Sequence, residues 1–174
     1  MHPEHENEKK VFLTFDDGPT ELTNEILDIL SDENIHATFF TIGNRMEMHP
    51  DIVTKTYENG HMILPHSYSH DYAIYTTFDS FYKDFYKAED VYKSVLGIDT
   101  PPIFRFPGGS SNHSSFQYGG KQFMPNLTAD IREKGYSMWE LRSIGKLHII
   151  ILIIRNKDFV YGIELTVRCI KVEI

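Results

Sequence analysis

Two clusters of polar side chains carry the groups that metal-assisted hydrolysis requires. Asp16 and Asp17 are neighbouring carboxylates in the run Thr-Phe-Asp-Asp-Gly-Pro-Thr, and His66 and His70 are spaced four apart in the run His-Ser-Tyr-Ser-His. Two imidazoles and one carboxylate can hold a divalent ion while leaving positions open for water and substrate. A second carboxylate beside the ion can accept a proton from a water whose pKa the ion has lowered. The two clusters together predict a hydrolytic metal site.

Within this predicted site the four residues have different expected roles. Asp17 supplies an oxygen ligand, and His66 and His70 supply nitrogen ligands from one helical turn, because residues at i and i+4 lie side by side on a helix. Asp16 stays off the ion as the proton acceptor. Each cluster alone has a plainer interpretation, a tight turn for the Asp-Asp-Gly-Pro run and a solvated helical turn for the histidine pair. Their joint occurrence after separate predicted strands favours the site.

The elements around the clusters alternate between strands and helices. Short apolar or β-branched runs predict strands at residues 11–15, 37–42, 61–64, 103–106 and 136–141. Helical spacing predicts a helix capped by Thr23, a helix opened by Pro50, and helices at residues 78–96 and near residues 126–134. About five β-α repeats imply parallel strands with helical crossovers, which is an α/β fold. Both clusters follow strand ends, where the sites of such folds assemble.

The composition favours a folded globular domain and argues against a nucleic-acid-binding or membrane-spanning protein. The chain has 174 residues, 41% of them hydrophobic, which predicts a folded domain with a core. Its formal net charge of −8 argues against a nucleic-acid partner, which would require a basic face. The longest apolar run, residues 149–154, is far shorter than the roughly 20 residues of a membrane span. The polar, acidic start differs from a secretory leader. No pattern indicates a dimer interface, so a monomer is favoured.

The polar clusters resemble motifs of the NodB-type polysaccharide deacetylases, also called carbohydrate esterase family four. Residues 14–20 resemble the first motif, and residues 66–70 resemble the second, His-Ser/Thr-x-x-His. Residues 105–108, Arg-Phe-Pro-Gly, resemble the third motif, Arg-x-Pro-aromatic-Gly, with Gly108 in place of the aromatic residue. The three motifs occur in the family's order and at spacings typical of it. The resemblance covers roughly residues 10–140.

The resemblance implies a distorted (β/α) barrel and a metal-dependent hydrolase that removes acetyl groups from N-acetylglucosamine-containing polysaccharide, such as peptidoglycan or chitin. In the family's pattern Asp16 is the catalytic base, and Asp17, His66 and His70 are metal ligands, most often of zinc. The implied partner is a polysaccharide substrate. Members of the family usually act outside the cytoplasm or at the cell surface. The start of this chain offers no export signal, so its own location stays open.

Arg105 and Gly108 take their expected roles from the third motif. Arg105 would hold and orient Asp16, because an ion pair to arginine keeps a carboxylate ionised. The alternative for Arg105 is a surface salt bridge worth ~0–1 kcal/mol. The backbone N–H near Gly108 would face the developing oxyanion, since a glycine turn permits close approach. The histidines that match no motif are expected at the surface or at strand ends: His36, His49 and His61.

The resemblance ends near Leu141. Residues 135–140 resemble the approach to the fourth motif, Asp-x-x-Asp-Trp, without its aspartates, and the adjacent Leu-His pair at 147–148 does not fit the Leu-x-His of the fifth. Residues 142–174 carry a net charge of +3, nine isoleucines and no proline, whereas residues 1–141 carry −11. We expect a polar extension at residues 1–10, a partial deacetylase domain at 11–140, and an atypical tail at 141–174. The barrel would then be incomplete at its C-terminal end.

Two explanations fit the tail: a shifted or otherwise replaced reading frame from about residue 141, or a genuine, divergent C-terminus. In either case no residue can be assigned as the acid for the leaving group, and a missing acid costs ~10²–10⁴ in rate. An enzyme impaired in this way is expected to favour O-acetyl esters over N-acetyl sugars. The alternatives are a catalytically silent carbohydrate- or metal-binding remnant of the family and a product that does not fold stably.

Overall fold

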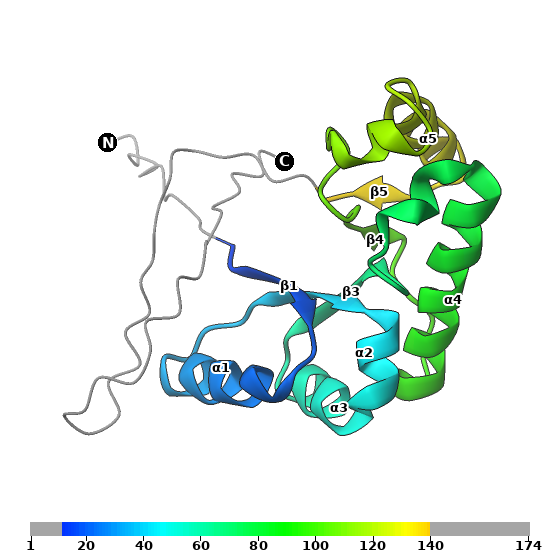
Figure 1. The fold of residues 1–174 in the computed structure, drawn as a ribbon. Coiled ribbons are helices and arrows are strands. Elements are labelled where there is room, and N and C mark those ends of the chain that lie inside the picture. The colour runs from blue at the N-terminus through cyan, green and yellow to red at the C-terminus, as the bar shows by residue number, and fades with distance from the viewer. Residues whose placement is uncertain (1–11, 140–174) are drawn as a thin grey trace, which may run out of the picture. The chain divides into compact units, whose positions relative to one another are not determined.

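The strands of the structure follow one another in chain order. The computed structural model describes residues 12–139, and from Phe15 onward these belong to one compact unit. Strands β1 (Thr14–Gly18), β2 (Thr38–Ile42) and β3 (Met62–Ser67) form one sheet in that order, and β4 (Ile103–Phe104) pairs with β5 (Ser137–Met138) (Figure 1). The β2–β3 and β4–β5 pairs are parallel. The Arg105 N–H donates to the Pro65 carbonyl at 3.2 Å, which links the end of β3 to the segment after β4.

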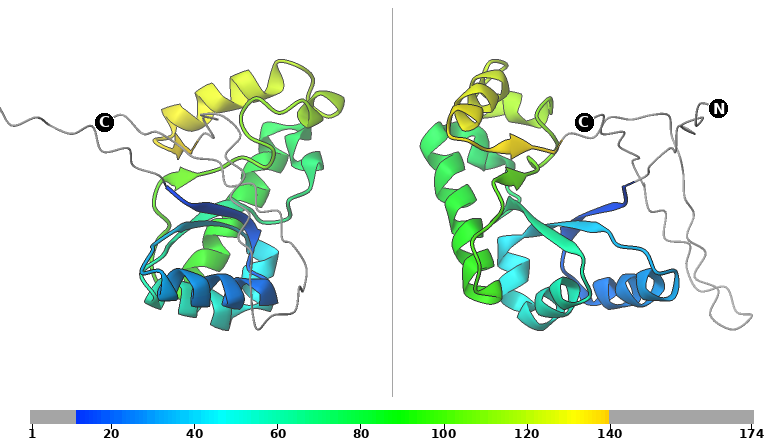
Figure 2. Two further views of the ribbon diagram at one scale, coloured as in Figure 1. Left: turned by 90° about the vertical axis from the view of Figure 1, so that its left-hand side faces the viewer. Right: turned by 180° about the vertical axis from the view of Figure 1, so that it is seen from behind.

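Helices occupy the connections between these strands and lie on their outer side (Figure 2). They are α1 (Glu21–Asp32), α2 (Gly43–Met48), α3 (Pro50–Glu58), α4 (Phe78–Leu96) and α5 (Phe123–Glu133), with the 3₁₀ turns η1 (Tyr72–Thr76) and η2 (Ser114–Gln117). This alternation confirms the predicted α/β class. Within residues 12–139 the strands form two sheets, β1-β2-β3 and β4-β5, and not a closed ring. No helix in that range is long and apolar enough to cross a membrane.

Helix α4 carries the larger hydrophobic core and confirms the helix predicted at residues 78–96. Its buried side chains recur at helical spacing: Phe81, Phe85, Ala88, Val91 and Tyr92. The Phe85 ring packs against Phe104 of β4 with ring centroids 4.9 Å apart. Full burial of such a side chain contributes on the order of 1.5–3 kcal/mol. The packing therefore fixes the position of β4, the strand that leads directly into Arg105.

The first turn of α1 differs from the prediction. Thr20 is the N-cap, whereas Thr23 is the third residue of the helix and accepts the Thr20 N–H at 3.0 Å. The two threonines form a reciprocal capping box. The apolar spacing located the helix correctly but could not distinguish the two threonines, because both suit the start of a helix. Packing decides between them, since the Thr23 side chain is buried.

Several other boundaries also differ. β1 lies at Thr14–Gly18 rather than at residues 11–15, and β3 continues to Ser67 beyond residue 64. Polar residues at a strand's carboxyl end resemble a loop in sequence, but β1 and β3 both continue to pair with the neighbouring strand β2. Helix α2 was not predicted, β4 is shorter than residues 103–106, and α5 begins at Phe123. The predicted extension at residues 1–10 and the tail at 141–174 lie outside the described residues.

Candidate metal centre

The three predicted metal ligands converge at the carboxyl ends of β1 and β3. One carboxylate oxygen of Asp17 lies 3.4 Å from Nε2 of His66 and 3.1 Å from Nε2 of His70. The ligand atoms of the three residues all lie within 4.8 Å of one another. Two imidazoles and a carboxylate form a donor set found in catalytic zinc sites with three protein ligands. The structure thus brings these residues together in a group that could hold a metal ion.

A β-bulge sets the direction of the His66 side chain. Where β2 pairs with β3, Thr41 faces Pro65 and Ile42 faces Ser67, so His66 is the extra residue between them. A bulge bends the strand locally and redirects a side chain. The proline beside it lacks the N–H that a regular ladder would use, which suits a bulge. The strand pairing therefore turns the imidazole toward Asp17.

A backbone contact fixes the His66 imidazole. Its Nδ1 lies 2.8 Å from the carbonyl oxygen of Arg105. A proton on Nδ1, donated to that carbonyl, leaves the lone pair of Nε2 facing Asp17. His66 is 3% exposed, and this burial lowers its pKa. The neutral imidazole required of a metal ligand is therefore the favoured form.

His70 reaches the site from a loop and not from the helical turn that its spacing predicted. The backbone φ angle is +125° at Ser67 and +56° at His70, both unusual for residues other than glycine. The His70 N–H donates to the Ser67 hydroxyl oxygen at 2.9 Å. The prediction of a helical turn was wrong because β3 extends through Ser67, so the chain must turn within three residues to return His70 beside His66.

Asp17 and His70 stabilise each other's charged forms. The hydrogen bond from His70 lowers the pKa of Asp17, and the same bond raises the pKa of His70. The Arg45 guanidinium donates to the backbone carbonyl of Asp17 and adds positive charge nearby. Asp17 is therefore ionised at neutral pH, as an oxygen ligand must be.

Asp16 is paired with Arg105 beside the three ligands. The Arg105 guanidinium makes an ion pair with one oxygen of Asp16. Arg105 is 3% exposed, and its guanidinium carbon lies 3.9 Å from the centre of the Phe40 ring. Its Nε donates to the Trp139 carbonyl at 3.3 Å. The alternative of a surface salt bridge is therefore wrong: this arginine is buried and held on three sides, while the Asp16 side chain remains 31% exposed.

Tyr72 lies between Gly108 and the predicted metal ligand His70. A Cβ atom at Gly108 would stand 2.8 Å from the Tyr72 hydroxyl, and its φ of +74° also favours glycine. The Tyr72 ring meets the His70 ring edge-on, with centroids 6.0 Å apart. The tyrosine thus fills the space in which a side chain at position 108 would begin, which explains why glycine stands at the aromatic position of the third motif.

Three contributors were missed by sequence reasoning. Phe40 and Trp139 contact Arg105 as described, and Asp84 of α4 accepts hydrogen bonds from the loop that carries His70. Phe40 looked like an ordinary strand residue. Trp139 acts through its backbone carbonyl, which no sequence pattern reveals. Asp84 lies on the polar side of an amphipathic helix. Acidic residues are common there, so the sequence does not single out Asp84 as a functional residue.

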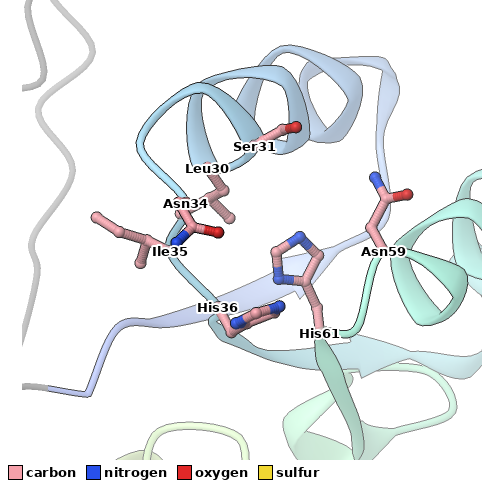
Figure 3. Close-up of a pocket in the computed structure, with 7 residues that line it drawn as sticks. All are labelled: Leu30, Ser31, Asn34, Ile35, His36, Asn59 and His61. Carbon is pink, nitrogen blue, oxygen red and sulfur yellow. The ribbon is translucent and has the colours of Figure 1, made fainter.

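A separate pocket lies at the opposite, amino-terminal ends of β2 and β3 (Figure 3). Its volume is about 220 Å³, and it is lined by Leu30, Ser31, Asn34, Ile35, His36, Asn59 and His61. The His61 Nδ1 accepts the Ala37 N–H at 3.2 Å, and burial lowers the pKa of His61. His36 and His61 thus stand at strand starts, as expected for histidines outside the motifs. This pocket shares no residue with the candidate metal centre.

Comparison with known proteins identifies the family. The family model described as polysaccharide deacetylase matches residues 4–123, which is more than half of the chain. The chain therefore belongs to the polysaccharide deacetylase family. This match agrees with the resemblance carried by the three sequence motifs.

Individual relatives and solved structures are also deacetylases by name. A peptidoglycan-N-acetylglucosamine deacetylase of Bacillus cereus is 35% identical over 117 residues, which are 67% of this chain and 42% of the relative. The crystal structure of the catalytic domain of a peptidoglycan N-acetylglucosamine deacetylase from Eubacterium rectale is 35% identical, with a TM-score of 0.69. That match covers 74% of this chain and 58% of the solved one. The chain spans less than half the length of the Bacillus relative.

One relative also aligns with part of the tail. An uncharacterised 30.6 kDa protein of Geobacillus stearothermophilus is 26% identical over 177 aligned positions, covering 95% of this chain and 67% of the relative. Such coverage requires that some of residues 141–174 take part in the alignment.

Proposed function

We propose that this chain is a metal-dependent hydrolase that removes acetyl groups from N-acetylglucosamine-containing polysaccharide, with peptidoglycan or chitin as substrate. The observation that carries the proposal is the convergence of Asp17, His66 and His70 beside the Asp16–Arg105 pair. Two of the relatives, from Bacillus cereus and Eubacterium rectale, are peptidoglycan N-acetylglucosamine deacetylases by name. Membership of the family and the donor set support the same chemistry.

The residues of the site fit a zinc ion. Asp17 is ionised by its bond to His70, and His66 is held neutral with Nε2 free to ligate. Three protein ligands leave a position open for water, as catalytic zinc requires. When bound, such an ion lowers the pKa of a water ligand and polarises an acyl carbonyl. We therefore assign zinc as the cofactor, held by Asp17, His66 and His70.

The remaining residues supply proton transfer and orientation. Asp16 is the base that accepts the proton of the attacking water, and its ion pair with the Arg105 guanidinium orients the carboxylate. Burial of Arg105 strengthens this pairing because little solvent screens it. The backbone N–H at Gly108 is the proposed donor to the developing oxyanion, since a backbone N–H in a turn can face the charge that develops in the transition state.

We also propose that the described strands belong to an incomplete, distorted (β/α) barrel. The order β1-β2-β3, the Arg105–Pro65 bond and the β4–β5 pair support one continuous run of strands. The barrel of eight strands places its sites at the same carboxyl edge. The division into an extension at residues 1–10, a catalytic domain at 11–140 and a tail at 141–174 belongs to this proposal.

A silent remnant of the family is the second candidate. It is favoured by the absence of the fourth-motif aspartates from residues 135–141. Such a protein would bind the ion and carbohydrate without hydrolysis. A missing acid affects amides more than esters, because an amine leaves poorly without protonation. An impaired enzyme is therefore expected to act faster on O-acetyl esters.

Acetate release from zinc-loaded protein separates the candidates. We would assay N-acetylglucosamine oligomers and an aryl acetate with the unaltered protein and with Asp16→Asn. The proposed enzyme should release acetate faster from the ester, and Asp16→Asn should lower the rate by ~10²–10⁴ while zinc still binds. Stoichiometric zinc without Asp16-dependent acetate would support the silent remnant. A faster rate on the N-acetyl oligomer would overturn the expected ester preference.

A further inference from the structure

We propose that Asp84 of α4 is a positioning residue for the metal centre, whose carboxylate holds residues 67–70 in the conformation that presents His66 and His70 to one ion. One of its oxygens accepts the Tyr68 N–H at 2.7 Å, and the other accepts the Ser69 N–H at 3.0 Å. Both bonds go to the short segment between the two histidines. The proposal rests on the metal centre proposed above.

The backbone conformation of residues 67–70 requires support from the surrounding structure. Ser67 and His70 both have positive φ angles, +125° and +56°, on either side of Tyr68 and Ser69. Non-glycine residues stay in such conformations only where the surrounding structure over-determines them. The two consecutive N–H groups of the segment point to one carboxylate, and bonds to an ionised acceptor are about twice as strong as neutral ones. Asp84 thus supplies the constraint that the backbone angles require.

Helix α4 makes this carboxylate a rigid support. The helix begins at a capping box formed by Thr77 and Ser80 and ends at Gly97 with a φ of +72°. Its apolar face is buried in the core described above. One turn after Asp84, the Lys87 ammonium lies 3.6 Å from the centre of the Tyr68 ring. The same face of α4 therefore contacts both the backbone and the side chain of the loop.

Helix α2 also binds Tyr68, through hydrogen bonds to its backbone carbonyl and its hydroxyl. The N–H of Asn44, in the first turn of α2, donates to the Tyr68 carbonyl at 3.0 Å. The Tyr68 hydroxyl donates to Glu47 of α2 at 2.9 Å. Both backbone polar groups of Tyr68 are thus bound by different helices, α4 and α2. The Ser67 hydroxyl holds the His70 N–H, so the chain from His66 to His70 is fixed at each step.

The test measures metal binding directly. Asp84→Asn keeps the shape of the side chain but replaces one acceptor oxygen with an NH₂ group that opposes a backbone N–H. We expect zinc affinity to fall by about 10–100-fold, the usual effect of losing a group that orients ligands. The visible spectrum of bound cobalt(II) should change as well, because it reports ligand geometry. Asp84→Glu, which keeps both acceptor oxygens, should recover part of the affinity.

Asp90→Asn is the matched control, because Asp90 lies on the same helix and is exposed. It should leave zinc affinity and the cobalt spectrum unchanged. If Asp84→Asn lowers the melting temperature but binds zinc within about twofold of the unaltered protein with the same cobalt spectrum, Asp84 is only structural and the proposal fails. If that variant does not fold, amide hydrogen exchange of the unaltered protein decides: slow exchange at Tyr68 and Ser69 supports the proposal, and rapid exchange overturns it.

These measurements distinguish failure of the positioning role of Asp84 from failure of the proposed enzyme activity. Zinc bound with Asp84-dependent affinity, but without acetate release, would support the positioning role and contradict only the enzyme activity. A protein that binds neither zinc nor cobalt would overturn both.

Discussion

The backbone carbonyl oxygen of Arg105 lies 2.8 Å from Nδ1 of His66, while the guanidinium of the same residue pairs with Asp16. One residue therefore touches a proposed metal ligand through its backbone and the proposed base through its side chain. The backbone contact survives any substitution that keeps the local fold. Changes to the side chain should consequently separate metal binding from proton transfer.

Arg105→Met tests this separation. Methionine has a similar length and suits a buried position, so the fold should persist, and the carbonyl that orients His66 remains. We expect zinc affinity to change by less than about threefold, while acetate release falls by ~10² or more because Asp16 loses its partner. Zinc competition titration and an acetate assay measure the two effects. A parallel loss of zinc binding would contradict the separation.

Zinc should stabilise the protein through Asp17, His66 and His70. A ligand that binds only the folded state raises stability by about 2.7 kcal/mol at a concentration one hundred times its Kd. Thermal unfolding with zinc and with a chelator measures the shift. His70→Ala should abolish it. His113→Ala, at an exposed histidine outside the site, should leave the shift intact. A zinc effect that survives His70→Ala would place the ion elsewhere.

Gly108 and Gly109 form a natural matched pair. Both have positive φ angles, +74° and +81°, but only at Gly108 would a Cβ meet other atoms, with the Tyr72 hydroxyl at 2.8 Å. Alanine at either position should cost roughly 1–2 kcal/mol for the left-handed backbone. Gly108→Ala should cost more, because the added methyl also displaces Tyr72. Urea unfolding of the two variants compares them, and equal losses would show that the Tyr72 contact relaxes freely.

Glu89 should make stability depend on pH. Burial raises its pKa, and its carboxylate accepts bonds from the hydroxyls of Thr100 and Tyr136 at 2.8 and 3.1 Å. The folded state therefore holds this proton more tightly than the unfolded chain. Its contribution to the free energy of unfolding should rise as pH falls from above the raised pKa toward the usual value of 4.5.

Glu89→Gln should remove that contribution, so its unfolding free energy should vary less over this range than that of the unaltered protein. At neutral pH the variant should be at least as stable. Urea unfolding at a series of pH values checks both statements. Glu25→Gln, at an exposed position of α1, is the control and should follow the unaltered protein. Identical pH profiles for Glu89→Gln and the unaltered protein would contradict the assignment.

Helix α4 shows why part of the fold could be predicted. Its apolar residues bury one face, so their spacing in sequence reports the packing directly, and the predicted range 78–96 is confirmed. The ends of β1 and β3 were misplaced because they carry polar residues, Asp17 and His66, which in sequence resemble the start of a loop. Their conformation depends on pairing with β2, which is a contact between distant segments. The short helix α2 was missed because its sequence, residues 43–48, has no such periodicity.

The sequence by itself determined which side chains could meet and in what order: two aspartates at the end of one strand, two histidines at the end of another, and an arginine at the end of a third. Side-chain chemistry and the common edge of parallel strands sufficed for that inference. Only the tertiary structure decided how they meet. The bulge at His66 arises where β3 pairs with β2, and the loop that carries His70 is held through its backbone N–H groups by the Asp84 carboxylate of α4. These contacts join segments that lie far apart in the chain, and nearly every residue type offers the same backbone N–H and C=O groups, so the sequence does not reveal which of them pair.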